Sequence, residues 1–476
     1  MNTNTKIIAT VGPSCDKKEV LQSMINSGVD TFRLNMSHGD MASKRKLYDL
    51  VKSLKPKNGV RPAILTDLAG PKIRIVGLKE ELIINENESI IISNEPGFKE
   101  NHLEVSGGIR FSSVLSGAEV LIDDGRIKLE VSEVISKHTL KCKTVIGGEI
   151  SNKKGVNFPG VTLNTPSLTQ EDIIDLKMAL DQGADWIALS FVCKANNILD
   201  VHSVMDEHGK RIPVMAKIEK WESLENLEEI INAFDGVMVA RGDLGVETPA
   251  SKVPLAQKKI VDLASTIGKP VVIATQLLES MIDSKVPTRA EVSDIANAIF
   301  DGVDALLVTG ETAIGKYPID VIKILKQVIF ETESATKFSN ALPPKKLNKT
   351  ADAISHAVCE ISTNLDINTI MTMTHSGSTA RMISNYRPKA TIFALTPFDE
   401  IVRQLQLIWG IIPIKVDNYD TVEKIPELCK KVLKQLGNTE TGDKFVITGG
   451  VPMGIKGTTN YLSVQTCLLY TSDAAD

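Results

Sequence analysis

The sequence predicts an α/β protein: a (β/α)₈ (TIM) barrel with an inserted all-β lid domain and a C-terminal open α/β domain. Three observations predict this fold. Eight short apolar runs each end in polar residues, one gap between runs is long and alternates at period two, and a Pro-Pro-Lys-Lys linker precedes further strand and helix patterns. Eight strand–helix units are the number that closes such a barrel.

The eight apolar runs are the predicted barrel strands. They are Ile7–Thr10, Thr31–Asn35, Ala63–Asp67, Trp186–Phe191, Val214–Glu219, Gly236–Asp243, Val271–Gln276 and Ala305–Glu311. Stretches with helical periodicity, such as Ser251–Ile267 and Arg289–Phe300, lie between most of them. We expect the barrel to comprise residues 1–70 and 164–338.

The gap between the third and fourth runs is too long for a helical crossover. Within it, Glu81–Asn94 and Val120–Lys143 alternate apolar and polar residues, and Asp-Asp-Gly-Arg at 123–126 is typical of a tight turn. Residues 71–163 are therefore expected to form a small β-barrel domain, inserted where it can act as a lid.

The last third of the chain again alternates strand and helix patterns. Residues 339–466 are predicted to form an open α/β domain with a largely parallel sheet. Residues 467–476 continue no pattern and are interpreted as a non-native tail.

Composition excludes several classes of function. A net charge of −5 argues against nucleic acid or an anionic membrane as the main partner. The six cysteines form no C-x-x-C pair, which indicates neither a zinc site nor a thioredoxin-like site. Scattered thiols, with no secretory or membrane-spanning segment, predict a cytoplasmic protein.

Cations, hydroxyls and carboxylates follow the predicted barrel strands. They are Arg33, Asn35, Ser37, His38, Asp67, Lys194, Lys217, Glu219, Arg241, Asp243, Thr275, Gln276, Thr309 and Glu311. Active sites of such barrels form at these strand ends. The mixture suits a phosphorylated anion held through a divalent metal, because Mg²⁺ prefers one or two carboxylates plus substrate oxygens. Lys and Arg neutralise a transferring phosphoryl group.

Two short motifs carry most of this prediction. Lys217 and Glu219 lie two residues apart on a strand and so share a face, although an internal ion pair is the alternative interpretation. The amides of Gly242 and Asp243 are expected to hold an anion at a helix start, the alternative being an ordinary glycine turn.

A third motif lies in the C-terminal domain. Hydroxyl-bearing residues and a glycine lie between a predicted strand and helix: Thr374, Ser376, Gly377, Ser378 and Thr379. This composition fits a phosphate-binding loop, and it equally fits a helix cap.

Taken together, the motifs resemble the pyruvate kinase family. The most specific are Arg33-Leu-Asn-Met-Ser-His-Gly39, Ala216-Lys-Ile-Glu219, Ala240-Arg-Gly-Asp-Leu-Gly-Val-Glu247 and Ala274-Thr-Gln-Leu-Leu-Glu-Ser-Met281. The resemblance extends from Thr10 to about Val464. It implies transfer of the phosphoryl group of phosphoenolpyruvate to ADP, giving pyruvate and ATP in glycolysis, and a regulatory role for the C-terminal domain.

The resemblance also implies a role for each residue. Glu219 and Asp243 would bind the catalytic Mg²⁺ or Mn²⁺. The catalytic residues would be Lys217, Thr275, Arg33, Arg74, Thr309 and Glu311. Substrate would contact Arg33, Lys217, Gly242, Asp243 and Thr275, and ADP would contact Pro13, His38 and Lys194. The loop of Thr374, Ser376, Gly377, Ser378 and Thr379 would bind a sugar-phosphate or AMP effector.

One departure from the family pattern concerns the monovalent cation. Many members need K⁺ and carry an acidic residue where this chain has Lys72, as the K⁺-independent branch does. We therefore expect that K⁺ is not required, because the Lys72 ammonium supplies its charge. Asn35, Ser37 and Asp67 are then residues that shape the pocket. Relatives are usually homotetramers, and the same is expected here.

Two other functions remain open at this stage. A metal-dependent aldolase or lyase acting on pyruvate enolate would share Glu219 and Asp243 but would not need the inserted domain or Lys194. A binding or regulatory protein on the same scaffold would be favoured by loss of Lys217, Thr275 or a metal carboxylate, and all are present. ATP formation from phosphoenolpyruvate and ADP discriminates between the three.

Overall fold

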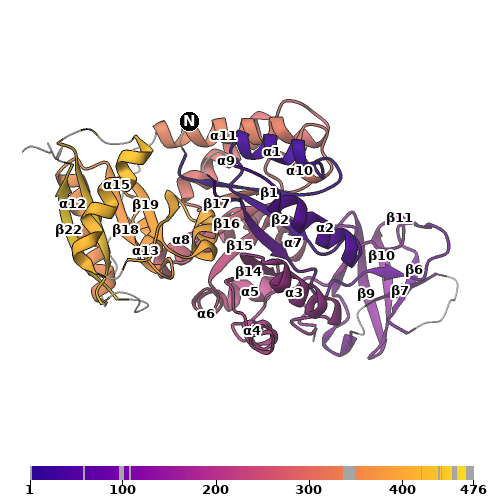
Figure 1. The fold of residues 1–476 in the computed structure, drawn as a ribbon. Coiled ribbons are helices and arrows are strands. Elements are labelled where there is room, and N and C mark those ends of the chain that lie inside the picture. Colours follow the sequence, from indigo (N-terminus) through magenta and orange to yellow (C-terminus); the bar gives the residue numbers. More distant parts are fainter. Residues whose placement is uncertain are drawn as a thin grey trace, which may run out of the picture. The chain divides into compact units, whose positions relative to one another are not determined.

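The computed structural model (Figure 1) describes residues 3–56, 59–95, 101–106, 109–163, 165–335, 349–419, 421–437, 440, 442–452 and 458–467. The chain forms two compact units. Unit 1 comprises Met1–Arg33, Asp49–Ile64 and Leu277–Asp476, and unit 2 comprises Leu34–Tyr48 and Leu65–Gln276. The expected linker after Phe338 lies outside the described residues, and so do residues 468–476 of the expected tail, whereas its first residue, Cys467, is described. The domain boundaries given above stay predictions.

All eight predicted barrel strands are present and close into one barrel, which confirms the fold class. Their order around it is β1-β17-β16-β15-β14-β13-β3-β2. They are β1 (Lys6–Thr10), β2 (Thr31–Asn35), β3 (Ala63–Asp67), β13 (Trp186–Leu189), β14 (Val214–Ile218), β15 (Gly236–Ala240), β16 (Val271–Ala274) and β17 (Ala305–Val308). Their side chains are nearly all buried, as expected for parallel strands covered by helices.

Several strands end before their apolar runs do. The run Gly236–Asp243 passes into helix α7 (Arg241–Glu247), and the run Ala305–Glu311 passes into helix α10 (Gly310–Ala313). Apolar composition does not distinguish strand from helix where one leads directly into the other. Arg241, Asp243 and Glu311 therefore lie in first helical turns, where backbone N–H groups lack partners within the helix, and Thr309 is the N-cap residue of α10.

Helices connect the barrel strands as predicted, and α8 and α9 match the two expected crossovers to within about two residues. The remaining elements of this part are α1 (Lys18–Ser27), α2 (Met41–Lys52), α3 (Gln170–Gln182), α4 (Asn197–His208), α5 (Trp221–Glu225), α6 (Leu227–Ala233), η2 (Ala250–Lys252), α8 (Val253–Ile267), η3 (Glu279–Ile282), α9 (Arg289–Asp301) and α11 (Pro318–Ala335). No helix among the described residues combines the length and apolarity needed to cross a bilayer.

A capping box begins helix α3. The Thr169 hydroxyl accepts from the amide of Asp172 at 3.0 Å, and Asp172 Oδ2 accepts from the amide of Thr169 at 2.9 Å. The other carboxylate oxygen of Asp172 accepts from the amide of Gly70 at 3.0 Å. This buried side chain thus joins the start of α3 to the loop after β3.

The inserted domain is all-β, as its period-two pattern predicts (Figure 1). Its larger sheet has the order β12-β8-β9-β10-β6-β7-β4, and β11 pairs with β5. The strands are β4 (Ile75–Val76), β5 (Leu82–Ile84), β6 (Ser89–Ser93), β7 (His102–Val105), β8 (Glu119–Ile122), β9 (Ile127–Ser136), β10 (Thr139–Ile146), β11 (Gly148–Ile150) and β12 (Val156–Asn157), with the turn η1 (Phe111–Ser113). The turn between β8 and β9 has positive φ at Asp123, Asp124 and Gly125.

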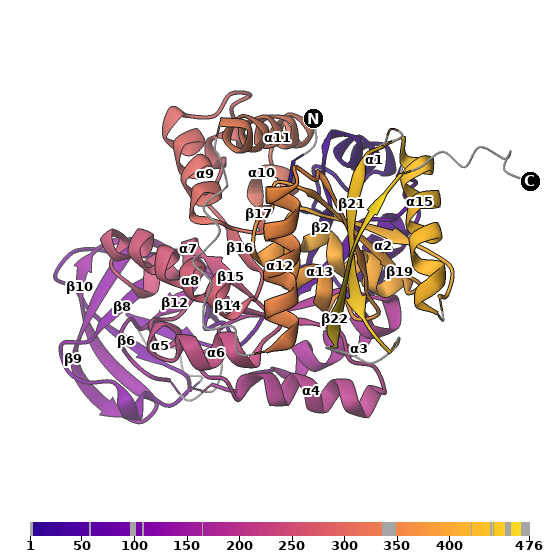
Figure 2. The same ribbon diagram turned by 90° about the vertical axis from the view of Figure 1, so that its left-hand side faces the viewer.

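The C-terminal domain is an open sheet with the order β20-β19-β18-β21-β22, in which β22 alone is antiparallel to its neighbour. Figure 2 shows α12 and α13 on one side of this sheet and α15 on the other. The elements are α12 (Thr350–Asn364), β18 (Thr369–Met373), α13 (Ser378–Asn385), β19 (Thr391–Thr396), α14 (Asp399–Gln404), η4 (Leu405–Leu407), β20 (Ile411–Lys415), η5 (Val422–Lys424), α15 (Ile425–Leu436), β21 (Lys444–Gly450) and β22 (Thr459–Thr466).

Within unit 1, polar contacts join this domain to barrel strands β1 and β17. The Lys6 ammonium donates to the carbonyl of Ile411 at 2.9 Å, and burial lowers the pKa of Lys6. Arg387 forms an ion pair with Asp304 at 3.3 Å and lies 4.7 Å from the centre of the Trp409 ring. The joint combines a buried cation, an ion pair and an aromatic ring.

Candidate active site

Lys217 is the centre of a polar cluster in unit 2. Its Nζ lies 2.9 Å from Glu219 Oε1 and 3.1 Å from Asp67 Oδ1, and it donates to Ser190 Oγ at 2.7 Å. Both carboxylates are about 1 % exposed. The ends of β3, β13 and β14 therefore present one cation between two buried anions. The internal ion pair between Lys217 and Glu219, the alternative interpretation of this motif, is present. It lies at the strand ends where the sequence predicts an active site.

Glu219 is held in place at both carboxylate oxygens. Oε1 faces Lys217, and Oε2 accepts from the amide of Phe191 at 2.8 Å. Burial raises the pKa of Glu219, Lys217 opposes that rise, and Asp243 adds to it. Asp243 thus disfavours the charged form of Glu219, and a divalent cation bound to both carboxylates would offset that repulsion.

Asp243 and Lys72 form an ion pair at the edge of this cluster. Asp243 lies in the first turn of α7, and its Oδ1 is 3.4 Å from Lys72 Nζ. Each side chain is about 30 % exposed. The ammonium expected to supply the charge of K⁺ thus lies beside a predicted metal ligand.

Among the described residues, no group of three or more His, Cys, Asp or Glu side chains is arranged to hold a metal ion. A site of two carboxylates does not meet that condition, and Mg²⁺ commonly completes its coordination with water and substrate oxygens. Glu219 and Asp243 therefore fit a metal that is bound together with a phosphorylated substrate.

Thr275 has an unusual backbone conformation. Its φ is 68° and that of Gln276 is 55°, values that β-branched and other non-glycine residues rarely adopt. The Arg241 guanidinium stabilises both by donating to the carbonyl of Thr275 at 2.9 Å and to that of Gln276 at 2.7 Å. Strained residues held in this way gather at functional sites.

The Thr275 hydroxyl is also fixed. It donates to the carbonyl of Ala274 at 2.6 Å and accepts from the amide of Gly242 at 2.9 Å. The Gly242 amide, predicted to hold a substrate carboxylate, therefore has a partner here that such a carboxylate would replace.

Unit 1 holds other predicted site residues. Arg33, near the end of β2, donates to Thr10 Oγ1 at 3.1 Å, and Pro13 is exposed. Glu311 is about 1 % exposed and accepts from the amides of Thr309 at 2.7 Å and Leu278 at 3.1 Å. Glu311 thus organises the backbone around Thr309.

Other predicted residues lie at the surface of unit 2. His38 and Lys194 are exposed, and so is Ser37, whose amide donates to Asn35 Oδ1 at 3.1 Å. Arg74 lies in the inserted domain, where its guanidinium donates to the carbonyl of Lys153 at 2.7 Å.

The predicted effector loop contains hydroxyls that largely contact one another. Thr374 Oγ1 accepts from the amide of Gly377 at 2.9 Å, and Ser376 Oγ donates to Ser378 Oγ at 3.1 Å. Thr379 Oγ1 lies 2.8 Å from Thr459 Oγ1. Gly377 is the N-cap residue of α13, and no side chain makes a cap hydrogen bond to the first turn of this helix. The Thr374 hydroxyl therefore fixes the loop at Gly377 and does not cap the helix.

Sequence reasoning missed several residues that build this site. Ser190 and the amide of Phe191 lay inside a run that was interpreted only as an apolar strand, and Arg241 was noted without a role. All three act through contacts with residues distant in the sequence. The one local indication was the polar Ser190 near the end of its run.

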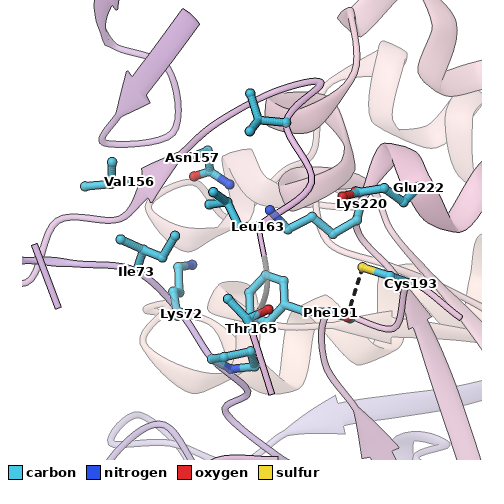
Figure 3. Close-up of a pocket in the computed structure, with 12 residues that line it drawn as sticks. Lys72, Ile73, Val156, Asn157, Leu163, Thr165, Phe191, Cys193, Lys220 and Glu222 are labelled. Atoms are coloured by element: carbon cyan, nitrogen blue, oxygen red, sulfur yellow. Dashed lines mark hydrogen bonds between the residues drawn. The ribbon is translucent and has the colours of Figure 1, made fainter. Parts of the chain in front are cut away.

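A cavity of about 40 Å³ lies where the inserted domain meets the barrel strands of unit 2 (Figure 3). Lys72, Val156, Asn157 and Leu163 line it from the inserted segment. The barrel loops contribute Phe191, Cys193, Lys220 and Glu222. The cavity is large enough for a few water molecules.

Comparison with known proteins places these features in one family. The family model "Pyruvate kinase, barrel domain" matches residues 2–322, and "Pyruvate kinase, alpha/beta domain" matches residues 352–465. "Pyruvate kinase 2" of Synechocystis sp. is 40 % identical over 466 residues, which cover 97 % of this chain and 79 % of the relative. A Staphylococcus aureus "Pyruvate kinase" is 38 % identical over 467 residues, which cover 97 % of this chain and 80 % of the relative. A crystal structure of a pyruvate kinase from Cryptosporidium parvum aligns with a TM-score of 0.92 and 31 % identity, over 98 % of this chain and 96 % of that one.

Proposed function

Because the chain belongs to the pyruvate kinase family, whose enzymes transfer the phosphoryl group of phosphoenolpyruvate to ADP in glycolysis, we propose that Lys217, Glu219 and Asp243 carry this transfer. The observation that carries the proposal is the Lys217 ammonium held between Asp67 and Glu219. An aldolase or lyase is not favoured, since both matching family models describe pyruvate kinase domains and the matching relatives, which cover 97 % of this chain, are pyruvate kinases.

Glu219 and Asp243 would hold Mg²⁺ or Mn²⁺, the metals that the family uses. When bound, the metal supplies positive charge to the oxygens of the phosphoryl group and orients them. The repulsion that Asp243 exerts on the charged form of Glu219 supports this assignment, because a cation bound to both carboxylates would offset it.

Lys217 would stabilise the phosphoryl group as it leaves the enol oxygen, since its ammonium is already fixed by three neighbours and needs little reorganisation. Arg33 and Arg74 would bind phosphate oxygens. The amides of Gly242 and Asp243 would bind the substrate carboxylate. Thr275 would lie beside the methylene of the enolate, where its fixed hydroxyl helps to place the proton that completes pyruvate.

Thr309 and Glu311 would assist this proton transfer from the end of strand β17, Glu311 by holding the backbone of Thr309. Pro13, His38 and Lys194 would contact ADP, and the exposure of all three leaves them accessible to a nucleotide. Asn35, Ser37 and Asp67 would shape the pocket around the phosphoryl group.

Activity is expected to persist when tetramethylammonium is the only monovalent cation, because the Lys72 ammonium sits 3.4 Å from Asp243 Oδ1 and supplies a fixed positive charge. A coupled assay of ATP formation from phosphoenolpyruvate and ADP, run with K⁺ and with tetramethylammonium, measures this. Lys72→Glu is expected to make activity K⁺-dependent. Strong stimulation of the unaltered chain by K⁺ would contradict the role of Lys72, whereas inactivity in both salts would contradict the kinase function.

We also propose that a phosphorylated metabolite, a sugar phosphate or AMP, binds the loop of residues 374–379 and activates the enzyme. The hydroxyls of this loop and the start of α13 support the proposal. Calorimetry is expected to detect binding of fructose bisphosphate, hexose phosphate, ribose phosphate or AMP, and Ser378→Glu is expected to abolish it by repulsion. Binding of none of them would remove the proposal.

The enzyme is further proposed to be a cytoplasmic homotetramer. The six cysteines, none of which forms a disulfide, support a reducing compartment. Strand β22 lies at an edge of its sheet and could pair with a second copy of itself.

A further inference from the structure

A second polar cluster lies in unit 2, apart from Lys217, around the buried carboxylate of Glu247. Glu247 Oε1 accepts from Lys220 Nζ at 2.6 Å and from Asn157 Nδ2 at 2.7 Å. The Glu247 side chain is about 1 % exposed. Its other oxygen, Oε2, is buried and has no hydrogen-bond partner among the described residues. Asn157, Lys220 and Glu247 are called the Glu247 cluster below.

The three residues of the Glu247 cluster come from segments with different roles. Asn157 belongs to strand β12 of the inserted domain. Lys220 directly follows Glu219, and Glu247 is the last residue of α7, whose first turn contains Asp243. A helix of this length spans about 10 Å. One carboxylate thus joins the inserted domain to both segments that carry the proposed metal ligands.

The cavity shown in Figure 3 lies beside the same contact. Asn157 and Lys220 both line it, with Val156 on one side and Phe191 and Cys193 on the other. Across an open gap, dispersion attraction between apolar side chains is weak. A short hydrogen bond to a buried carboxylate is therefore the contact best able to fix the separation of the two sides.

The cluster also connects back to Glu219 through Phe191. Lys220 Nζ lies 5.9 Å from the centre of the Phe191 ring, and the Phe191 amide donates to Glu219 Oε2. A shift of Asn157 relative to Glu247 would therefore displace Glu219 through Lys220 and Phe191. The same shift would displace Asp243 through helix α7.

We propose that Glu247, with Asn157 and Lys220, is a positioning residue that fixes the inserted domain against the barrel in the orientation required for phosphoryl transfer. It acts through Glu219 and Asp243 and does not touch substrate. The kinetic test of this proposal rests on the proposed function, because it measures kinase activity. The contact between Asn157 and Glu247 can be tested without that function.

Asn157→Ala removes the donor on the inserted domain and leaves the Lys220–Glu247 ion pair intact. Because a hydrogen bond to a charged acceptor is worth roughly a tenfold change in equilibrium or more, kcat/KM for phosphoenolpyruvate is expected to fall by about tenfold or more. The melting temperature is expected to change little. Asn152→Ala is the matched control, because Asn152 exchanges hydrogen bonds with Leu78 inside the inserted domain only.

Exchanging the amide and the carboxylate between positions 157 and 247 tests the hydrogen bond between these two side chains directly. Asn157→Asp places a second carboxylate against Glu247 and is expected to lower activity further than Asn157→Ala. Adding Glu247→Gln supplies an amide that can donate to the introduced carboxylate, so the double variant is expected to recover much of the lost activity. The single and the double variant share the substitution at position 157, so their comparison holds even if Asn157→Ala melts early.

Tryptophan fluorescence gives a readout that does not require activity. Trp221 follows Lys220 and is half-buried, whereas Trp186 and Trp409 are buried. Quenching by acrylamide is expected to increase in Asn157→Ala and to stay unchanged in Asn152→Ala.

The proposal is overturned if Asn157→Ala matches Asn152→Ala in kcat/KM and in quenching, or if the double variant is no more active than Asn157→Asp. If the unaltered chain lacks kinase activity, the proposed function fails and quenching alone decides the positioning role.

Discussion

Replacing Lys217 with methionine is expected to lower kcat by about a thousandfold or more. The ammonium is held 2.9 Å from Glu219, 3.1 Å from Asp67 and 2.7 Å from Ser190, so it is preorganised for charge that develops on the phosphoryl group. Loss of one such fixed group typically costs about two to five orders of magnitude. Methionine keeps the length of the side chain and removes its charge. The coupled assay of ATP formation measures the effect.

The same change is expected to destabilise the fold, because it leaves two buried carboxylates without their cation. Removing one partner of a buried ion pair costs about 3–5 kcal/mol. Lys44→Met is a matched control, since Lys44 pairs with Asp175 at 2.7 Å and the exposures of the two side chains are 11 % and 4 %, close to those around Lys217. The control should lose similar stability and keep its kcat. A Lys217→Met enzyme with a nearly normal kcat would contradict the catalytic role of Lys217.

Replacing Glu219 with glutamine is expected to weaken metal binding and to lower activity by about a hundredfold or more at a fixed Mg²⁺ concentration. Glutamine still accepts from the Phe191 amide, so the local fold should persist. Titration of Mg²⁺ in the assay, and of Mn²⁺ by electron paramagnetic resonance, measures the loss. Because burial raises the pKa of Glu219, a proton competes with the metal, and affinity in the unaltered chain should fall as pH falls.

Glu222→Gln is the control for this change. Glu222 lies three residues further along, is about 9 % exposed, and burial raises its pKa as well, but it lines the cavity of Figure 3 instead of facing Lys217. Its Mg²⁺ dependence should match that of the unaltered enzyme. Equal metal affinity in Glu219→Gln and Glu222→Gln would remove Glu219 from the metal site.

The barrel was predictable because its pattern is local and repeated. Strands such as Ala63–Asp67 are apolar for most of their length and end in a polar residue, and a capping box such as Thr169–Asp172 marks the start of a helix between strands. The inserted domain was predictable for a related reason, since Val120–Lys143 alternates at period two around a turn of positive-φ residues. Such signatures depend on neighbours in the chain and require no knowledge of distant contacts.

The parts that escaped prediction depend on contacts between distant segments. Nothing near Thr275 in the sequence indicates its φ of 68°, because Arg241 stabilises that conformation from another loop. Ser190 contacts Lys217 across 27 positions, and the Gly242 amide finds Thr275 across 33. The predicted residues were of the right chemical types, whereas the hydrogen bonds that orient them became visible only in three dimensions.

The joint between β1, β17 and the C-terminal sheet bears on how the chain can be shortened. A fragment that stops before Thr350 would lose the Ile411 carbonyl that satisfies Lys6 and the Arg387 guanidinium that neutralises Asp304. The Lys6 ammonium and the Asp304 carboxylate would then be exposed to water or would need new hydrogen-bond partners at the N-terminal ends of β1 and β17. The sequence pattern separates the barrel from the C-terminal domain clearly. Removing the C-terminal domain would nevertheless destabilise the barrel, because these polar contacts would be lost. A minimal catalytic fragment would therefore need compensating substitutions at Lys6 and Asp304.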